Sequence, residues 1–193
     1  MKQKTIYLKD YTVPEYLISH TDLFFDLSES KTTVTSKLSI KRNPACSISR
    51  PALVLTGEEL TLESVSLNGS ILTSKQYMLD EETLSIAYPG DEFTLEISNR
   101  INPESNTALS GLYKSNDMLC TQCEAEGFRR ITWFLDRPDV MSTYSVTIEA
   151  DKNKYPILLS NGNRTNQTDL NNGKHQASWQ DPFPKPSYLF ALV

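Results

Sequence analysis

Residues 120–130, Cys-Thr-Gln-Cys-Glu-Ala-Glu-Gly-Phe-Arg-Arg, bring two cysteines, two glutamates and two arginines close together in the sequence. Cys120 and Cys123 have the spacing of a zinc knuckle or of a redox pair. Glu124 and Glu126 follow directly and could bind a cation. The segment is therefore compatible with a metal or redox site, with a carboxylate site for a positively charged ligand, or with an ordinary turn.

The cysteine pair lacks the partners that a metal or a nucleophilic site would need. A structural zinc ion takes four ligands, and the remaining candidates, Cys46, His20 and His175, are not paired at ligand spacing. A cysteine nucleophile needs a positioned base, and nothing nearby in the sequence orients a histidine. We therefore expect Cys120 and Cys123 to be buried or partly buried structural thiols.

The carboxylates leave two interpretations open. If a strand continued through Gln122, Glu124 and Glu126, all three side chains would lie on one face. That face could be a polar edge in contact with solvent. A carboxylate beside an amide oxygen can also accept hydrogen bonds from an ammonium group. Spacing alone does not choose between these possibilities.

The elements around this segment are predicted to be strands. Apolar and polar residues alternate in several stretches, as expected for half-buried strands, and Asn68-Gly69 between two such patterns is a strong hairpin signal. The alternating stretches are residues 33–40, 82–88, 93–98 and 143–150. We predict about ten short strands and an all-β, antiparallel domain with several sheets in a sandwich-like or saddle-like arrangement.

Signals for helices are few. Residues 124–135 could hold one turn or a short helix, and residues 137–144 another, with Pro138 in the first turn. Residues 181–188 contain three prolines within five positions, so they must be extended or turning. The apolar residues 187–193 are predicted to form a strand, and we expect the native chain to continue after it.

Composition excludes several classes of function. The 193 residues carry a net charge of −5, with 38% hydrophobic and 22% charged residues. No stretch combines strong basic charge with interleaved aromatic residues, so no nucleic-acid partner is expected. No apolar run approaches the roughly 18 residues of a membrane span. The basic N-terminus is not followed by an apolar run, and there are only three cysteines, so we expect a cytoplasmic protein without a disulfide framework.

The segment from residue 119 to residue 163 resembles the amino-terminal domain of bacterial aminopeptidase N, in the gluzincin family of zinc aminopeptidases. The resemblance extends over essentially all of residues 1–193 and is most specific from residue 106 onward. It is carried by a Thr-Gln-x-Glu motif, an arginine five residues later and an Asp-x-Pro. These positions are Thr121, Gln122, Glu124, Arg129, Asp136 and Pro138.

The resemblance implies that residues 1–193 are one domain of a longer cytoplasmic enzyme. The zinc motif His-Glu-x-x-His and the substrate loop Gly-Ala-Met-Glu-Asn of the family do not occur in this sequence. Both would belong to a thermolysin-like catalytic domain after residue 193. We therefore expect this segment to hold no zinc and to be inactive alone, with the remaining domains of its own chain and a peptide substrate as its partners.

The resemblance assigns substrate contacts to two residues. Glu124 would help to bind the free α-amine of the peptide, and Gln122 would line the pocket for the first side chain. No catalytic or metal-binding residue is expected here. Arg129 and Asp136 are expected to form an internal ion pair, and Pro138 a turn.

The main alternative is an independent β-sandwich module that binds carbohydrate or peptide. Aromatic side chains exposed on one sheet face would favour it. The sequence has only two tryptophans, Trp133 and Trp179, and the resemblance places both in the framework.

Overall fold

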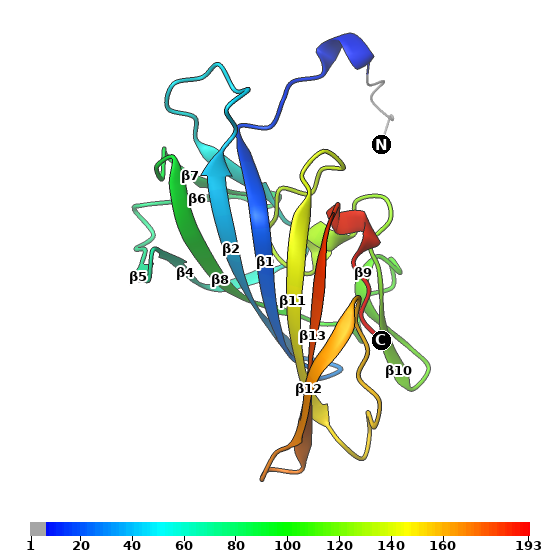
Figure 1. The fold of residues 1–193 in the computed structure, drawn as a ribbon. Coiled ribbons are helices and arrows are strands. Elements are labelled where there is room, and N and C mark those ends of the chain that lie inside the picture. The colour runs from blue at the N-terminus through cyan, green and yellow to red at the C-terminus, as the bar shows by residue number, and fades with distance from the viewer. Residues whose placement is uncertain (1–6) are drawn as a thin grey trace.

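The computed structural model describes residues 7–193, which consist mainly of strands and loops (Figure 1). The predicted all-β class with several sheets and little helix is confirmed. The strands are β1 (Tyr16–Asp26), β2 (Thr32–Arg42), β3 (Leu53–Thr56), β4 (Thr61–Leu67), β5 (Ser70–Ile71), β6 (Met78–Leu79), β7 (Thr83–Ile86), β8 (Glu92–Ile101), β9 (Gly111–Ser115), β10 (Met118–Gln122), β11 (Ser142–Asp151), β12 (Asn163–Asp169) and β13 (Lys174–Lys185).

Helical structure in residues 7–193 is limited to three short 3₁₀ helices. These are η1 (Leu8–Asp10), η2 (Phe128–Arg130) and η3 (Ser187–Leu189). None of the helices in this part of the chain is long and apolar enough to cross a membrane.

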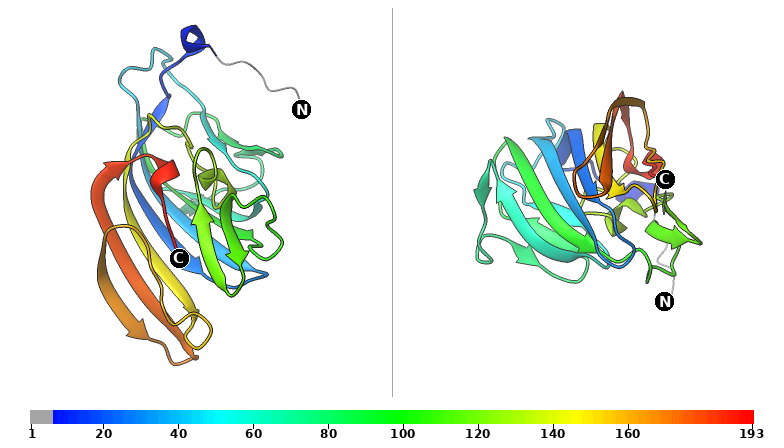
Figure 2. Two further views of the ribbon diagram at one scale, coloured as in Figure 1. Left: turned by 90° about the vertical axis from the view of Figure 1, so that its right-hand side faces the viewer. Right: turned by 90° about the horizontal axis from the view of Figure 1, so that it is seen from below.

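The main sheet has eight strands in the order β12-β13-β11-β1-β2-β8-β4-β5. It is strongly curved, and the β9–β10 hairpin and the C-terminal end lie together beside it (Figure 2). Every pair of neighbours is antiparallel except β1 and β11, which run parallel from His20↔Thr143 to Asp26↔Glu149. The expectation of an antiparallel domain is thus correct for all neighbours but one. Alternation within a strand does not specify its partner's direction.

The strands that were predicted from alternation bury the expected face. In β2, the side chains of Val34, Leu38 and Ile40 are all buried. Ser36 lies on the same buried face, where its Oγ is 3.0 Å from Oγ1 of Thr132. This hydrogen bond satisfies two hydroxyls that would otherwise be costly to bury.

An aromatic cluster seats η2 and the C-terminal segment on the sheet. The ring centroids of Phe128 and Phe134 are 4.7 Å apart, and Phe128 lies 5.3 Å from Phe190. Phe190 in turn stacks on Phe25 of β1, with centroids 6.1 Å apart. Such aromatic pairs stabilise a core beyond the area they bury. The segment that carries the candidate site is therefore packed directly on the main sheet.

The hairpin predicted at Asn68-Gly69 is confirmed between β4 and β5. Both residues have positive φ angles, 50° and 79°, as a tight hairpin turn requires. Oδ1 of Asn68 also accepts a hydrogen bond of 2.9 Å from the main-chain N–H of Thr94. The asparagine thus fixes the turn and ties it to the neighbouring strand β8.

Two local predictions are wrong. Residues 137–144 form a turn at Pro138 and Asp139 rather than a helix, because residues from Ser142 onward pair with the neighbouring strands β1 and β13. The C-terminal residues are not a strand either. They begin with η3, and only Leu192 forms an isolated bridge, with Ser160.

Two glycines with similar positive φ angles provide a test of backbone packing. Gly69 (φ 79°) has open space where a Cβ would be, whereas a Cβ on Gly162 (φ 84°) would lie 2.2 Å from the main-chain oxygen of Gln180. We expect Gly69→Ala to lower the free energy of unfolding by about 1–2 kcal/mol through its backbone conformation alone. Gly162→Ala should lower the free energy of unfolding by clearly more, because β13 must also shift. Urea unfolding of both variants checks this, and equal losses would contradict the described packing.

Candidate functional site

The candidate segment leaves its strand earlier than the sequence suggests. Strand β10 ends at Gln122, and the chain then turns, with the N–H of Gly127 donating to the carbonyl of Cys123 over 2.8 Å. Glu124 and Glu126 are both exposed on this turn. The prediction that Gln122, Glu124 and Glu126 share a strand face is therefore wrong.

Gly127 explains why the turn can lie so close to the end of β10. A Cβ at this position would meet the main-chain oxygen of Gln122 at 2.4 Å and Oγ of Ser110 at 2.8 Å. Only glycine fits without displacing the main chain. These contacts arise where the chain folds back on the end of β10 and on Ser110, which a strand pattern does not reveal.

The turn nevertheless brings both glutamates to one hollow of about 490 Å³. Its other lining residues are Ala125, Pro138 and Tyr188. Gln122 is not part of the lining; its side-chain N–H donates to the main-chain oxygen of Glu124 over 3.2 Å. Gln122 therefore braces the backbone that carries Glu124.

The expected ion pair between Arg129 and Asp136 is present beneath the turn. Nε of Arg129 lies 3.0 Å from Oδ2 of Asp136, whose side chain is only 1% exposed. The same oxygen accepts from the main-chain N–H of Arg129 over 3.2 Å, and Nη2 of Arg129 donates to the main-chain oxygen of Asp136 over 3.1 Å. A carboxylate buried this deeply requires such charged and main-chain donors.

Ser187 is a member of this network that sequence reasoning missed. Its hydroxyl donates to Oδ1 of Asp136 over 2.5 Å, and its side chain is buried. The two residues are 51 positions apart, and no periodic pattern connects them. Ser187 begins η3, so this hydrogen bond attaches the element that carries Tyr188 to the buried carboxylate of Asp136.

Thr121 and Arg130 hold the two ends of the segment. The hydroxyl of Thr121 accepts from the main-chain N–H of Leu192 over 2.9 Å. Arg130 pairs with Glu58 at 2.9 Å and with Glu59 at 2.5 Å across a neighbouring loop. Neither contact could be read from local spacing, because the partners are about 70 residues away in each case.

The cysteines and histidines are not assembled into a site. Cys120 and Cys123 are buried free thiols, as predicted. Burial, reinforced by the charge of Asp136, raises the pKa of Cys123 to about 12. His175 is buried with its Nε2 2.7 Å from the main-chain oxygen of Tyr155. Within residues 7–193, no three His, Cys, Asp or Glu side chains are arranged to hold a metal ion.

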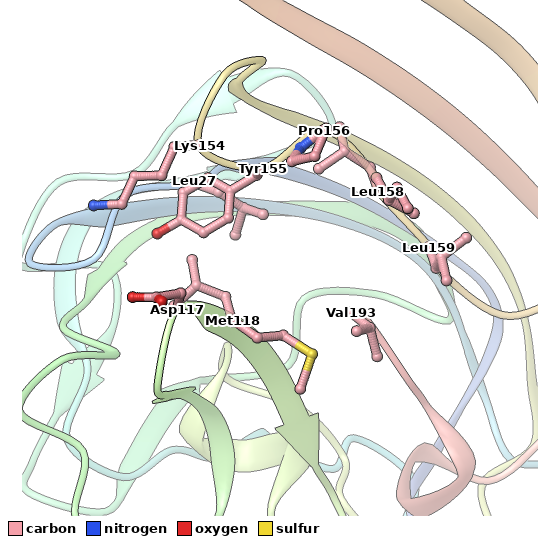
Figure 3. Close-up of a pocket in the computed structure, with 11 residues that line it drawn as sticks. Leu27, Asp117, Met118, Lys154, Tyr155, Pro156, Leu158, Leu159 and Val193 are labelled. Carbon is pink, nitrogen blue, oxygen red and sulfur yellow. The ribbon is translucent and has the colours of Figure 1, made fainter.

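A second, apolar groove of about 350 Å³ lies between the β9–β10 hairpin and residues 154–159. Met118 and Val193 face Leu158 and Leu159 across it (Figure 3). Met118 is 48% exposed. The lining of the groove is mostly apolar and could bind apolar side chains, with Asp117 and Lys154 as its charged members.

Comparison with known proteins identifies relatives over nearly the whole chain. A family model described as the peptidase M1 N-terminal domain matches residues 17–189. The chain is 53% identical over 187 residues to aminopeptidase N of Escherichia coli, a match that covers 97% of this chain and 21% of that protein. The chain thus spans about a fifth of the length of this curated relative.

Solved structures show the same fold. The aminopeptidase A of Legionella pneumophila, in complex with aspartic acid, superposes with a TM-score of 0.91 at 38% identity, over 96% of this chain and 22% of that one. An M1 zinc metallopeptidase of Deinococcus radiodurans, bound to a Tyr-Ser-Ala substrate, gives a TM-score of 0.76 at 18% identity, over 92% of this chain and 42% of that one. At this lower identity the second likeness shows the fold alone.

Burial of Cys123 predicts slow alkylation. With its pKa raised to about 12, only about one thiol in ten thousand is ionised at pH 8, compared with roughly a quarter at the ordinary pKa near 8.5. Iodoacetamide at pH 8 should therefore modify Cys123 in the native protein far more slowly than in urea, as followed by peptide mass spectrometry. Equal rates in the two states would show that the thiol is accessible and ionisable.

Proposed function

The chain belongs to the peptidase M1 N-terminal domain family, and on this premise we propose that it is the amino-terminal domain of a cytoplasmic zinc aminopeptidase. The full-length enzyme would hydrolyse the first peptide bond of peptides. The names of the similar proteins and the chain's share of their length support this proposal. Within the enzyme, we assign this domain the recognition of the substrate's amino terminus.

Glu124 is the proposed acceptor for the substrate's α-ammonium group. The observation that carries this assignment is the position of Glu124 at the hollow, exposed on a turn whose base is fixed by the buried Arg129–Asp136 pair. An enzyme that removes one residue at a time must place the first peptide bond at a fixed distance from the charged α-amine. A fixed carboxylate does this and holds the peptide in register for attack.

Gln122 has a proposed double role. Its side-chain N–H holds the main-chain oxygen of Glu124, which limits movement of the anchor. Its exposed amide would border the space for the first side chain of the peptide. Because Gln122 does not line the hollow of Glu124, the amine and the first side chain would occupy neighbouring spaces.

The zinc ion is assigned to the part of the enzyme outside this chain. A catalytic zinc needs three protein ligands with an open position, and the described residues offer no such group. The residues of this chain therefore do not fit the metal. We propose that the segment holds no zinc, contributes no catalytic residue and is inactive alone.

The apolar groove beside the β9–β10 hairpin is the proposed contact for the remaining domains. Exposed apolar surface of this kind usually marks an interface, and the relatives are several times longer than this chain.

Both tryptophans belong to the framework: Trp133 is buried, and Trp179 is partly buried against the core. The alternative of a carbohydrate-binding or peptide-binding module therefore finds no support from tryptophans on a sheet face.

The amine anchor predicts a large effect of Glu124→Ala in the full-length enzyme. Removing one partner of a charge pair that is desolvated on binding typically costs about 2–5 kcal/mol. We therefore expect kcat/KM for a free-amine aminoacyl reporter to fall by roughly 30-fold or more, at about 1.4 kcal/mol per tenfold. Steady-state kinetics on folded protein measures this change.

Glu126→Ala is the matched control. Glu126 lies on the same turn and lines the same hollow, but the resemblance assigns it no substrate contact. Its carboxylate is 69% exposed and contacts Nη2 of Arg129 at 3.3 Å, an interaction worth little at the surface. Its loss should change kcat/KM by less than about threefold. The proposal fails if the two variants behave alike, or if Glu124→Ala retains wild-type kinetics.

The assignment of zinc predicts different behaviour for the segment and the full-length enzyme. Purified residues 1–193 should contain no stoichiometric zinc by elemental analysis and should cleave no aminoacyl reporter. The full-length enzyme should contain one zinc ion and lose activity with a chelator. A tightly bound zinc ion in the isolated segment would overturn this assignment.

A further inference from the structure

The hollow that contains Glu124 has walls from three separate segments. The turn after β10 supplies Glu124 and Glu126, the turn before β11 supplies Pro138, and η3 supplies Tyr188. These segments are distant along the chain, so their relative positions depend on contacts between them. The shape of the hollow therefore rests on whatever joins the three.

Asp136 lies in the segment of one wall and makes direct contacts with the segments of the other two. Its Oδ2 accepts from the main-chain N–H and from Nε of Arg129, which anchors the turn of Glu124. Its Oδ1 accepts from the hydroxyl of Ser187 in η3. Asp136 itself stands two positions before Pro138. The two oxygens of the carboxylate thus accept hydrogen bonds from two segments that carry different walls of the hollow.

The surroundings of Asp136 hold its carboxylate in place. Its side chain is 1% exposed, and Arg129 supplies the compensating charge. The negative charge of Asp136 also contributes to the raised pKa of the buried Cys123 thiol and of the buried Tyr144 hydroxyl, after the larger effect of burial. Both neighbours therefore stay neutral at neutral pH. The donors to the carboxylate are Arg129, through its side chain and its main-chain N–H, and Ser187.

We infer that Asp136 is a positioning residue for the recognition of the substrate's amino terminus, acting through Glu124. This inference rests on the proposed function of Glu124. Without the charge of Asp136, the Arg129 guanidinium loses its buried partner, and the turn and η3 each lose one of the contacts that position them. Glu124 would then sample positions from which it no longer fixes the ammonium group.

A positioning role can be distinguished from a role in stability alone. If Asp136 acts only on the fold, its loss should lower activity by the same factor whether or not Glu124 is present. If it acts through Glu124, its loss should matter only while Glu124 is there to be positioned. A double-mutant cycle measures this coupling directly.

The experiment uses the full-length enzyme and a free-amine aminoacyl reporter. We expect Asp136→Asn, which keeps the size of the side chain and removes its charge, to lower kcat/KM by roughly 10-fold to 100-fold. In a Glu124→Ala background, the same substitution should cause less than about twofold further loss. Asp139→Asn is the matched control. Asp139 is a second carboxylate, next to Pro138, but it pairs with Arg137 at 2.8 Å rather than with Arg129 or Ser187. It should retain wild-type kinetics.

Ser187→Ala keeps the test decisive if Asp136→Asn does not fold. This variant removes the hydrogen bond to Oδ1 of Asp136. We expect kcat/KM to fall by about threefold to tenfold, again only when Glu124 is present. Losses that multiply in the double variants would overturn the inference while leaving Glu124 as the anchor. Wild-type kinetics of Glu124→Ala would overturn the proposed function, and the inference with it.

Discussion

The buried ion pair between Arg129 and Asp136 is the interaction on which the candidate site depends. Removing a carboxylate from water costs several kcal/mol and is offset only by close charged and polar partners. Here those partners are Arg129, through its side chain and its main-chain N–H, and Ser187. Because Arg129 follows the turn of Glu124 and Ser187 precedes Tyr188, satisfying one charge also helps to fix the geometry of the hollow.

In the proposed site, the carboxylate that contacts the substrate is separate from the groups that hold it in place. Glu124 is exposed at the hollow and can exchange water for an ammonium group, while its backbone is held by Gln122 and its turn by Arg129. A rigid backbone under an exposed carboxylate reduces the entropy lost on binding. On the proposed function, the domain would fix the position of a peptide's amino terminus without taking part in bond cleavage.

The sequence specifies the local elements well and their assembly less well. Alternation in residues 33–40 and the Asn68-Gly69 signal identify β2 and the hairpin, because each depends on neighbouring residues. The parallel pairing of β1 with β11 and the contact of Ser187 with Asp136 depend on tertiary packing, which no local pattern shows. The sequence leaves both a strand and a turn open at Glu124, because the turn is made possible by the close approach of Gly127 to the end of β10.

The most direct test of this account is a structure of the full-length enzyme with a bound peptide that has a free amino terminus. The measured quantity is the distance from the Glu124 carboxylate to the peptide's α-ammonium nitrogen. We predict a charge-assisted hydrogen bond of about 2.7–2.9 Å, with the Arg129–Asp136 pair intact beneath it. An ammonium group bound elsewhere, with Glu124 facing solvent, would contradict the account.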